Sequence, residues 1–289
     1  MTAIQVLRAR FPRATANLRR YGGAATRWVD QAGQLGWFAV LGARGMVWAL
    51  TIYRKEIVRL IAQVGMGTGA MAVVGGTGVI IAFVTLSSGS LVALQGFSAL
   101  SQIGIQTLLG FVAALINVRL VAPVVTGVVL AATVGAGATA ELGAMRISEE
   151  IDALEVMGIN SMAYLVSTRA LAGQVVIIPL YSLGLIMSFL APQVVTTVLY
   201  GQTSGTYEHY FRTFLRPDDV FWSFVEVIIM AGVVMLTHCY YGYTAGGGPV
   251  GVGEAVGRSM RLSLVSVNVV VLLGEMALYG VNPNFNFTV

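Results

Sequence analysis

Long apolar runs, separated by short polar segments, make up most of this 289-residue chain. Five of the runs are long enough to cross a bilayer as a helix, which takes about 20 predominantly apolar residues. They cover residues 64–86, 103–140, 170–200, 220–243 and 261–281. The pattern therefore predicts an all-α polytopic membrane protein with about five transmembrane helices. The intervening segments are expected to be outer loops at 87–102 and 201–219 and an inner glycine-rich loop at 244–260.

The run at 103–140 is too long for one straight crossing, and it contains Arg119 and Pro123. A proline inside a helix removes one backbone donor and clashes with the preceding turn. We therefore expect this segment to be broken, or partly re-entrant, near these two residues.

An earlier apolar stretch at 35–50 is interrupted by Arg44, and three of the chain's four tryptophans lie in or beside it. Apolar and aromatic residues beside arginines favour an amphipathic helix that lies in the membrane plane. A weak first transmembrane helix is the alternative. We therefore divide the chain into a basic N-terminal region at 1–60, which contains this interfacial helix, and a membrane domain at 61–289.

The composition excludes a soluble enzyme. Only 10% of the residues are charged and 56% are hydrophobic, whereas a soluble globular domain carries roughly 25% charged residues. The single Cys239 and the distant His209 and His238 offer no metal motif or nucleophile–base pair, and we interpret His238 as a packing residue. No glycine-rich loop is followed by GK[ST]. The chain itself is therefore expected to hold no cofactor, and any ATP hydrolysis would need a separate subunit.

Basic residues are distributed unevenly, since ten of the 17 precede residue 60. If the N-terminus is cytoplasmic, only Arg212 and Arg216 fall in the predicted outer loops, as the positive-inside rule requires. The C-terminus is then expected outside. We interpret the basic N-terminal region as a flank beside anionic lipid and not as a nucleic-acid-binding region.

The segment at 141–169 is the only dense run of charge in the interior of the sequence. Ser148 is a plausible N-cap for a short amphipathic helix at 147–158, with Glu149 and Glu150 in its first turn. On the predicted topology this acidic helix faces the cytoplasm. It is either a docking surface for an ATPase subunit or a solvated linker.

Three ionisable residues, Arg119, Glu226 and Glu275, lie inside predicted transmembrane helices. Such residues usually face a cavity or pair with one another, because a charge in the bilayer centre is unfavourable by roughly 2.5–3.5 kcal/mol. They indicate either a lipid cavity, with Arg119 beside an anionic headgroup, or a buried ion pair of Arg119 with one of the glutamates. A proton relay is a third possibility, although the sequence offers few carboxylates for one.

Short motifs follow one another between residues 119 and 169: R-x-x-x-P at 119–123, A-E-L-G-x-M-R at 140–146, S-E-E-I-D-A-L at 148–154 and M-G at 157–158. Together they resemble the MlaE/YrbE permease family, and a weaker resemblance covers nearly the whole chain. The membrane domain at 61–289 would then be an MlaE-type permease domain.

The resemblance implies a dimeric permease of an ATP-binding cassette (ABC) transporter in the bacterial cytoplasmic membrane. Such permeases work with MCE-domain proteins on the outer side and move lipids across the envelope. The helix at 147–158 would be a coupling helix that inserts into an ABC ATPase dimer, which would hold the ATP and Mg²⁺. The residues expected at this contact are Glu141, Arg146, Ser148, Glu149, Glu150, Asp152, Leu154 and Glu155. Arg119 would lie near a lipid cavity between two permeases.

Thr133 and Thr168 depart from the family pattern, which often has Arg and Pro at these positions. An unlike partner chain could supply a missing group, and the actinobacterial YrbE branch pairs unlike permeases, so we favour a heterodimer over a homodimer. Relatives in that branch handle fatty acids, mycolic acids or sterols, which makes fatty acids or related lipids the expected substrates.

Other functions remain open. They are an ion- or proton-coupled secondary transporter of a hydrophobic substrate, a membrane-embedded enzyme and a structural scaffold. A secondary transporter would be expected to show an internal repeat, and we find no convincing one. An enzyme would need a polar catalytic cluster, and the sequence shows none.

Overall fold

The computed structural model describes residues 12–66 and 76–280 of the chain. Within these ranges the protein is all-α and contains six helical segments that are long and apolar enough to cross a membrane. The prediction of an all-α polytopic membrane protein is therefore confirmed. The principal helices are α2 (Pro12–Ile52), α3 (Arg54–Met66), α4 (Gly76–Ser101), α5 (Leu109–Ile116), α6 (Ala122–Leu130), α7 (Ala136–Ile147), α8 (Glu150–Val156), α9 (Thr168–Val194), α10 (Ser204–Phe214), α11 (Pro217–Tyr243) and α12 (Gly248–Tyr279).

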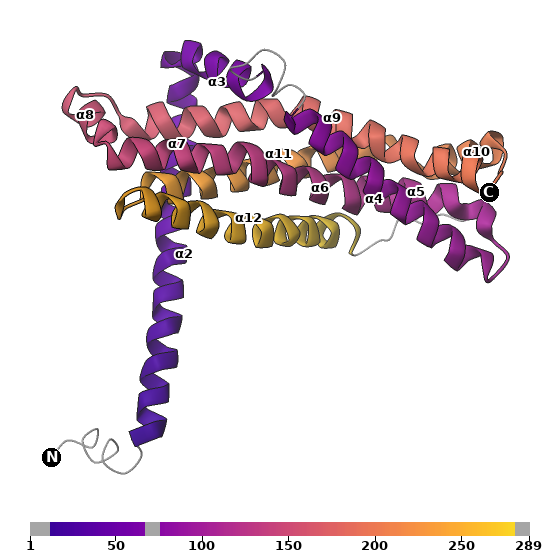
Figure 1. The fold of residues 1–289 in the computed structure, drawn as a ribbon, viewed down its shortest axis with the longest axis horizontal. Helices are drawn as coiled ribbons and strands as arrows, with labels where there is room; N and C mark the ends of the chain where they lie inside the picture. The colour runs from indigo at the N-terminus through magenta and orange to yellow at the C-terminus, as the bar shows by residue number, and fades with distance from the viewer. Residues whose placement is uncertain (1–11, 67–75, 281–289) are drawn as a thin grey trace.

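The long helices lie alongside one another in an elongated bundle, with α8 at one end and α10 at the other (Figure 1). Helix α11 is the central element, because it packs against α6, α7, α9 and α12. The main core cluster lies where these helices meet, and it includes Leu130, Ile177, Met230 and Val267. Glycines allow this close approach: Gly127 and Gly173 lie against the side chains of Met230 and Met235. Small residues at such crossings are the usual means by which membrane helices associate.

The expected break near Pro123 is absent. Residues Gln106–Ile147 form one continuous helical segment, the rod, in which π-helical turns at Asn117–Val121 and Ala131–Gly135 separate α5, α6 and α7. Pro123 lies in the first turn of α6, directly after a π turn. The wider turn accommodates the missing donor and the ring without breaking the helix.

The rod is longer than a membrane is thick. At 1.5 Å per residue, its 42 residues span roughly 63 Å, whereas the hydrocarbon core measures about 30 Å. Part of the rod must therefore lie outside the hydrocarbon layer unless the rod is strongly tilted. The α7 end leads directly into α8.

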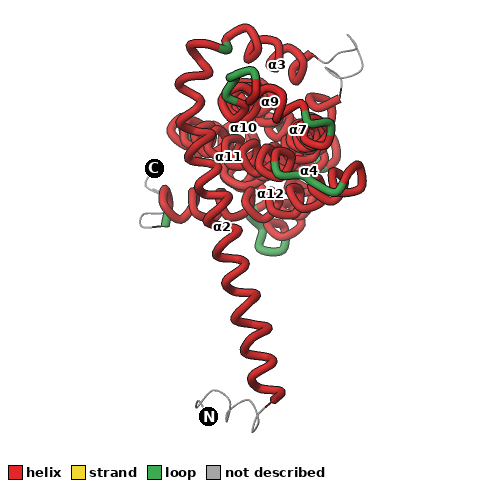
Figure 2. The backbone as a smooth tube through the Cα atoms, turned by 90° about the vertical axis from the view of Figure 1, so that its left-hand side faces the viewer, coloured by secondary structure: helices red, strands yellow, loops and turns green. Residues whose placement is uncertain are grey.

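Helix α2 runs across the bundle instead of along it, in both views of the molecule (Figures 1 and 2). Its segment Gly33–Ile52 is long and apolar enough to cross a membrane. However, a helix perpendicular to the transmembrane helices lies in the membrane plane, and this orientation supports an interfacial helix. Phe38 and Ala49 are buried against the bundle, while Trp37 and Trp48 are exposed. The Ser167 hydroxyl donates a hydrogen bond to the Gly42 carbonyl and fixes the contact.

Several predicted helix boundaries were wrong. The first predicted transmembrane run, 64–86, begins in α3 and passes through residues 67–75, which lie outside the described residues. Helix α4 then continues to Ser101, through the predicted outer loop at 87–102. The serines that suggested a loop are satisfied inside the helix: the hydroxyls of Ser88 and Ser90 donate to carbonyls four residues earlier.

The other two predicted loops are also shorter than expected. The outer segment at 201–219 contains α10, which lies across α5. The inner glycine-rich segment at 244–260 is mostly helical, because α12 begins at Gly248. Gly247 and Gly248 both have positive φ angles, 85° and 71°, which only glycine adopts easily.

The contact between α5 and α10 depends on Gly110. A methyl group on this residue would lie 2.6 Å from the Tyr207 carbonyl oxygen and 2.9 Å from the Phe211 nitrogen, both of which are backbone atoms. We expect Gly110→Ala to lower the free energy of unfolding by about 1–3 kcal/mol, because backbone must move. Gly137→Ala is the matched control. Gly137 lies on α7, and a methyl group on it would have no other atom within 4 Å. Equal melting temperatures of the two purified variants in detergent would contradict this account.

Candidate functional site

The corner between α7 and α8 is the first candidate site. Ser148 ends α7, and its hydroxyl donates to the Ala144 carbonyl oxygen at 3.0 Å. The predicted N-cap role of Ser148 is therefore wrong, since a hydroxyl that bonds back to its own helix does not cap the next one. Helix α8 begins at Glu150, later than predicted, and Glu149 joins the two helices with a positive φ of 62°. The predicted end at Gly158 is confirmed by its φ of 77° and its hydrogen bond to the Glu155 carbonyl.

Helix α8 is amphipathic, as predicted. Ile151 is fully buried in a core cluster with Leu142 and Val166, and Leu154 packs against the same cluster. The opposite side of the segment is exposed, including Glu149, Glu150, Asp152 and Glu155. Two apolar side chains at its end are also exposed, Val156 at 89% and Met157 at 66%. An exposed apolar tip beside carboxylates is typical of a surface that binds another protein.

Several of the predicted coupling residues hold this corner in place. Arg146 pairs with Asp152 at 2.5 Å. The Glu155 carboxylate accepts hydrogen bonds from Ser161 at 2.6 Å and from Tyr243 at 3.1 Å. These contacts fasten α8 to α7, to Ser161 in the segment that precedes α9, and to α11.

Glu141 belongs to the same end of the bundle, about two helical turns before the corner. It pairs with Arg169 of α9 at 3.3 Å and accepts a hydrogen bond from Gln63 of α3. By contrast, Glu149 and Glu150 form no ion pair within the described ranges, although the Ser148 hydroxyl donates to Glu150. The predicted coupling residues thus divide into two groups. One holds the corner in place, and the other, Glu149 and Glu150, faces outward.

The second candidate site is a buried polar cluster at the end of the bundle that carries α10. Arg119, in the π turn of the rod, pairs with Asp219 at 3.0 Å, and the two residues are only 9% and 5% exposed. The Tyr279 hydroxyl donates to the other carboxylate oxygen of Asp219 at 3.0 Å. The Arg119 guanidinium lies 3.6 Å from the centroid of the Tyr279 ring. This cluster therefore ties the rod, α11 and α12 together.

Of the alternatives for Arg119, the structure shows a buried ion pair, but with Asp219 in place of one of the glutamates. The hydropathy pattern predicts an outer loop at 201–219, which includes Asp219. The signal that could have revealed it is Pro217 followed by two aspartates, a typical first turn of a helix.

Glu226 and Glu275 lie near this cluster but do not join the ion pair. Glu226 is 6% exposed, and its buried Oε1 has no hydrogen-bond partner. The carboxyl packs directly on the α12 backbone, because a methyl group on Gly274 would lie 2.6 Å from Oε1. Glu275 is half-buried beside it and within electrostatic reach of it.

A separate polar node joins α7, α11 and α12 nearer the α8 end. The Thr139 hydroxyl lies 2.8 Å from Nδ1 of His238 and 3.2 Å from the Ser259 hydroxyl, and all three side chains are fully buried. Gly135 makes room for the imidazole, since a methyl group there would lie 2.5 Å from the ring. This geometry agrees with the interpretation of His238 as a packing residue.

The geometry describes a helical bundle with an outward-facing acidic corner at one end and a buried ion-pair cluster at the other. The family model for the permease MlaE matches residues 66–277, most of the chain. The chain belongs to the MlaE permease family. Apart from Gln63 and Tyr279, the residues of both candidate sites lie within the matched range.

Curated relatives agree with the MlaE assignment. A probable ABC transporter permease protein of Rickettsia bellii is 28% identical over 68% of this chain and 74% of its own length. One of Synechocystis is 29% identical over 68% of this chain and 75% of its own length. The chloroplastic protein trigalactosyldiacylglycerol 1 of Arabidopsis thaliana is 27% identical over 60% of this chain and 50% of its own length. This MlaE permease is therefore a multi-pass membrane protein and a transporter subunit.

The buried pair in this MlaE permease gives a direct stability test. Asp219→Asn should lower the free energy of unfolding by about 3–5 kcal/mol, because it leaves the Arg119 charge buried and unpaired. Asp218→Asn is the matched control: its side chain is 73% exposed and its 3.4 Å pair with Arg216 lies at the surface, where such pairs contribute little. Thermal melting of the two purified variants measures the difference. Similar melting temperatures would show that the Arg119–Asp219 pair is not a structural tie.

Proposed function

We propose that this chain is a transmembrane permease subunit of an ATP-driven MCE lipid transporter. The observation that carries the proposal is the α7–α8 corner, whose apolar tip and two carboxylates face outward at the end of the rod. The membership in the MlaE family and the relatives named as ABC transporter permeases support it. The ATP and Mg²⁺ would be held by a separate ATPase dimer, which would dock on this corner.

The packing of the corner would allow a displacement of α8 to be transmitted to the rod. Ile151 is buried, and the carboxylates of Asp152 and Glu155 are engaged by neighbouring elements, so α8 is fastened on its inner side. Its outer side, with Glu149, Glu150 and Val156, is free to contact a partner. Because α7 continues into the rod, closure of an ATPase against α8 would displace the rod and, with it, the Arg119 cluster.

The topology that we propose places α8 in the cytoplasm and α10 on the outer side of the cytoplasmic membrane. These two helices lie at opposite ends of the bundle (Figure 1), which supports the alternation predicted from the basic residues. MCE-domain proteins would then contact the α10 end. A second YrbE-type permease, most simply an unlike chain, would complete the transporter.

A lipid is the proposed substrate, in particular a fatty acid or a related lipid or sterol. The Arabidopsis relative bears the name of a galactolipid, which supports a lipid as the transported molecule. Apolar side chains cover the outside of the long helices, including Phe83, Ile186, Val265 and Leu272, so lipid can reach the bundle from the side.

A proton-coupled secondary transporter is a second candidate, favoured by one observation. Glu226 is a buried carboxyl in the membrane without a basic partner in the described ranges, and such groups occur in proton pathways. The two candidates differ in their energy source, since only the first needs an associated ATPase.

Charge reversal of the outward carboxylates tests the proposal. Glu149→Lys together with Glu150→Lys should reduce the amount of ATPase that co-purifies with the permease by about tenfold or more, because two charges at the contact change sign. These residues form no ion pair within the described ranges, so membrane insertion should be unchanged. Asp30→Lys, an exposed carboxylate on α2, is the matched control and should leave the ATPase bound.

Lipid uptake into vesicles distinguishes the two candidate functions. The ABC proposal predicts uptake that requires ATP and is lost in the double variant. Uptake that persists in the double variant and stops when the proton gradient is dissipated would overturn it in favour of the secondary transporter.

A further inference from the structure

The turn between α2 and α3 carries a group of basic side chains at the surface of the protein. We refer to residues 44–59, which contain this turn, as the elbow. Its basic residues are all exposed, whereas its one acidic residue, Glu56, is partly buried. The basic residues are Arg44, Arg54, Lys55 and Arg59. The charge bias of the N-terminal region does not tell which of its basic residues can reach a ligand, and the elbow identifies these four.

Helix α3 presents two of the basic residues on the face that points away from the bundle. Ile57 and Leu60 are buried where α3 packs against α9. Lys55 and Arg59 lie one turn apart on the opposite face, and both are exposed. Lys55 forms no ion pair in residues 12–66 and 76–280, and Arg59 has only a 3.5 Å contact with Glu56 on its own helix. Both charges are therefore available to an outside partner.

Helix α2 brings an exposed stripe of aromatic and apolar side chains to the elbow. Trp37, Leu41, Arg44 and Trp48 are spaced by four, three and four residues, which places them on one side of the helix. All four are exposed, while Ala49 is buried against the bundle. Arg44 forms no ion pair within the described ranges. Tryptophans beside an arginine are typical of a helix at the level of the lipid headgroups.

The elbow is held firmly, so its basic face stays at one level. The Tyr53 ring contacts the ring of Trp48 at 6.3 Å and that of Tyr164, in the segment before α9, at 5.1 Å. The Arg54 side chain donates from Nε to the Leu50 carbonyl at 2.8 Å. The elbow lies at the edge of the bundle in both views (Figures 1 and 2). Because α2 lies in the membrane plane, this edge faces the surrounding bilayer.

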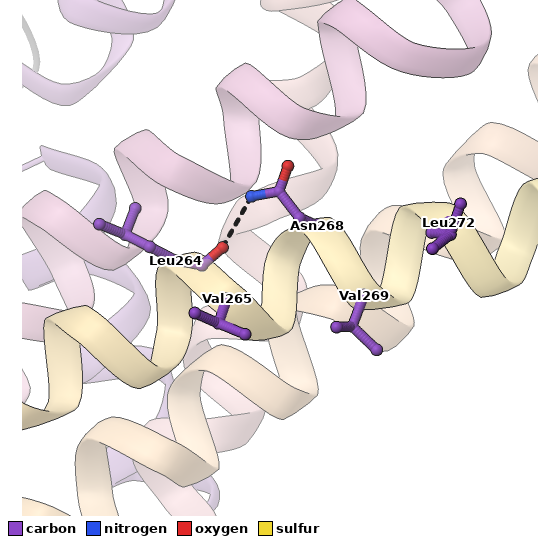
Figure 3. A pocket seen from close by; sticks show the side chains of 5 residues that line it. All are labelled: Leu264, Val265, Asn268, Val269 and Leu272. Carbon is purple, nitrogen blue, oxygen red and sulfur yellow. Dashed lines mark hydrogen bonds between the residues drawn. The ribbon is translucent and has the colours of Figure 1, made fainter.

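Exposed apolar surface alone does not select a headgroup, as a comparison with α12 shows. Its shallow hollow is lined by Leu264, Val265, Asn268, Val269 and Leu272 (Figure 3). The one polar side chain there, Asn268, donates to the Leu264 carbonyl of its own helix at 2.8 Å. No basic side chain lines this hollow, so it offers no cation to a phosphate. The elbow differs because its apolar side chains lie beside basic ones.

We propose that the elbow is a binding site for the headgroups of anionic phospholipids. Lys55, Arg59 and Arg44 contact the phosphates, while Trp48 and Val58, which are 50% and 64% exposed, lie against the upper part of the acyl chains. Exposed apolar side chains in the membrane plane match a bilayer surface, and the basic residues make that match specific for negative lipid. The proposal does not rest on the proposed function, since it holds whatever the protein transports.

Tryptophan quenching in vesicles tests the proposal. Trp28, Trp37 and Trp222 are replaced by Phe, so that Trp48 is the remaining tryptophan of the full chain. The protein is reconstituted with phosphatidylcholine and phosphatidylglycerol, of which one or the other is brominated and quenches a neighbouring indole. We expect phosphatidylglycerol to be preferred beside Trp48 by about fivefold or more, since each basic residue at an anionic surface contributes about that factor. The preference should decrease at high salt.

Trp222 supplies the control position. It lies on α11 near the start of that helix, at the end of the bundle that carries α10, and it is 44% exposed. With Trp28, Trp37 and Trp48 replaced by Phe, quenching of Trp222 should show little preference between the two lipids. Equal preferences at Trp48 and Trp222 would overturn the proposal, because the elbow would then contact lipid without selecting it.

Neutral substitutions test the basic residues themselves. Arg44→Gln, Lys55→Gln and Arg59→Gln together should bring the preference at Trp48 close to that at Trp222, because they remove the charges and leave the Arg54 contact in place. Lys55→Gln alone should reduce the preference in part. Arg212→Gln with Arg216→Gln, which are exposed near α10, is the matched control and should leave it unchanged. The melting temperature of each variant serves as the folding control. An unchanged preference in the folded triple variant would show that these residues do not bind the headgroups.

Discussion

The buried ion pair between Arg119 and Asp219 is the constraint around which the membrane bundle is organised. The two residues are 100 positions apart, and each charge is buried, so that it would be strongly unfavourable without the other. Because Tyr279 binds both of them, the pair also fixes the end of α12. The node of Thr139, His238 and Ser259 ties the same three parts of the chain nearer the other end. Helix α11 is therefore held to the rod and to α12 at two levels, with glycine-assisted packing between them.

In the proposed function a contact at α8 acts far from α8, and the helices provide a connection for it. The corner is fastened by Asp152 and Glu155, and the rod behind it is continuous up to Arg119. A rigid connection of this kind transmits displacement, whereas a flexible linker would absorb it. In the proposed docking of an ATPase, the exposed carboxylates would add specificity and the exposed apolar tip would add contact area.

The class of the fold could be predicted from the sequence, because a long apolar run can adopt few structures other than a helix in a membrane. The position of α8 could also be predicted, since its motif is specific. The ends of the helices could not be predicted. Serines in α4 resemble loop residues until their hydroxyls are seen to bond within the helix, and Ser148 resembles an N-cap for the same reason.

The sequence did not identify the partner of Arg119. Sequence spacing identifies charges inside apolar runs, but it does not say which end of one helix meets which end of another. Asp219 lies at the very start of α11, so hydropathy placed it in a loop. The chemistry of the residues therefore predicted that a buried pair was possible, and only the packing of the helices identified its second member.

The two π turns in the rod have a consequence for how such a helix can vary. Each π turn accommodates about one residue more than an α-helical turn, and one residue rotates everything that follows by about 100°. The face that α6 turns toward α4 and the face that α7 turns toward α12 are therefore set independently of each other. A single-residue insertion or deletion at Asn117–Val121 or Ala131–Gly135 would re-aim one half of the rod while leaving the other half in register. Such a change would thus alter the outer part of the rod without altering the geometry of the corner at its other end.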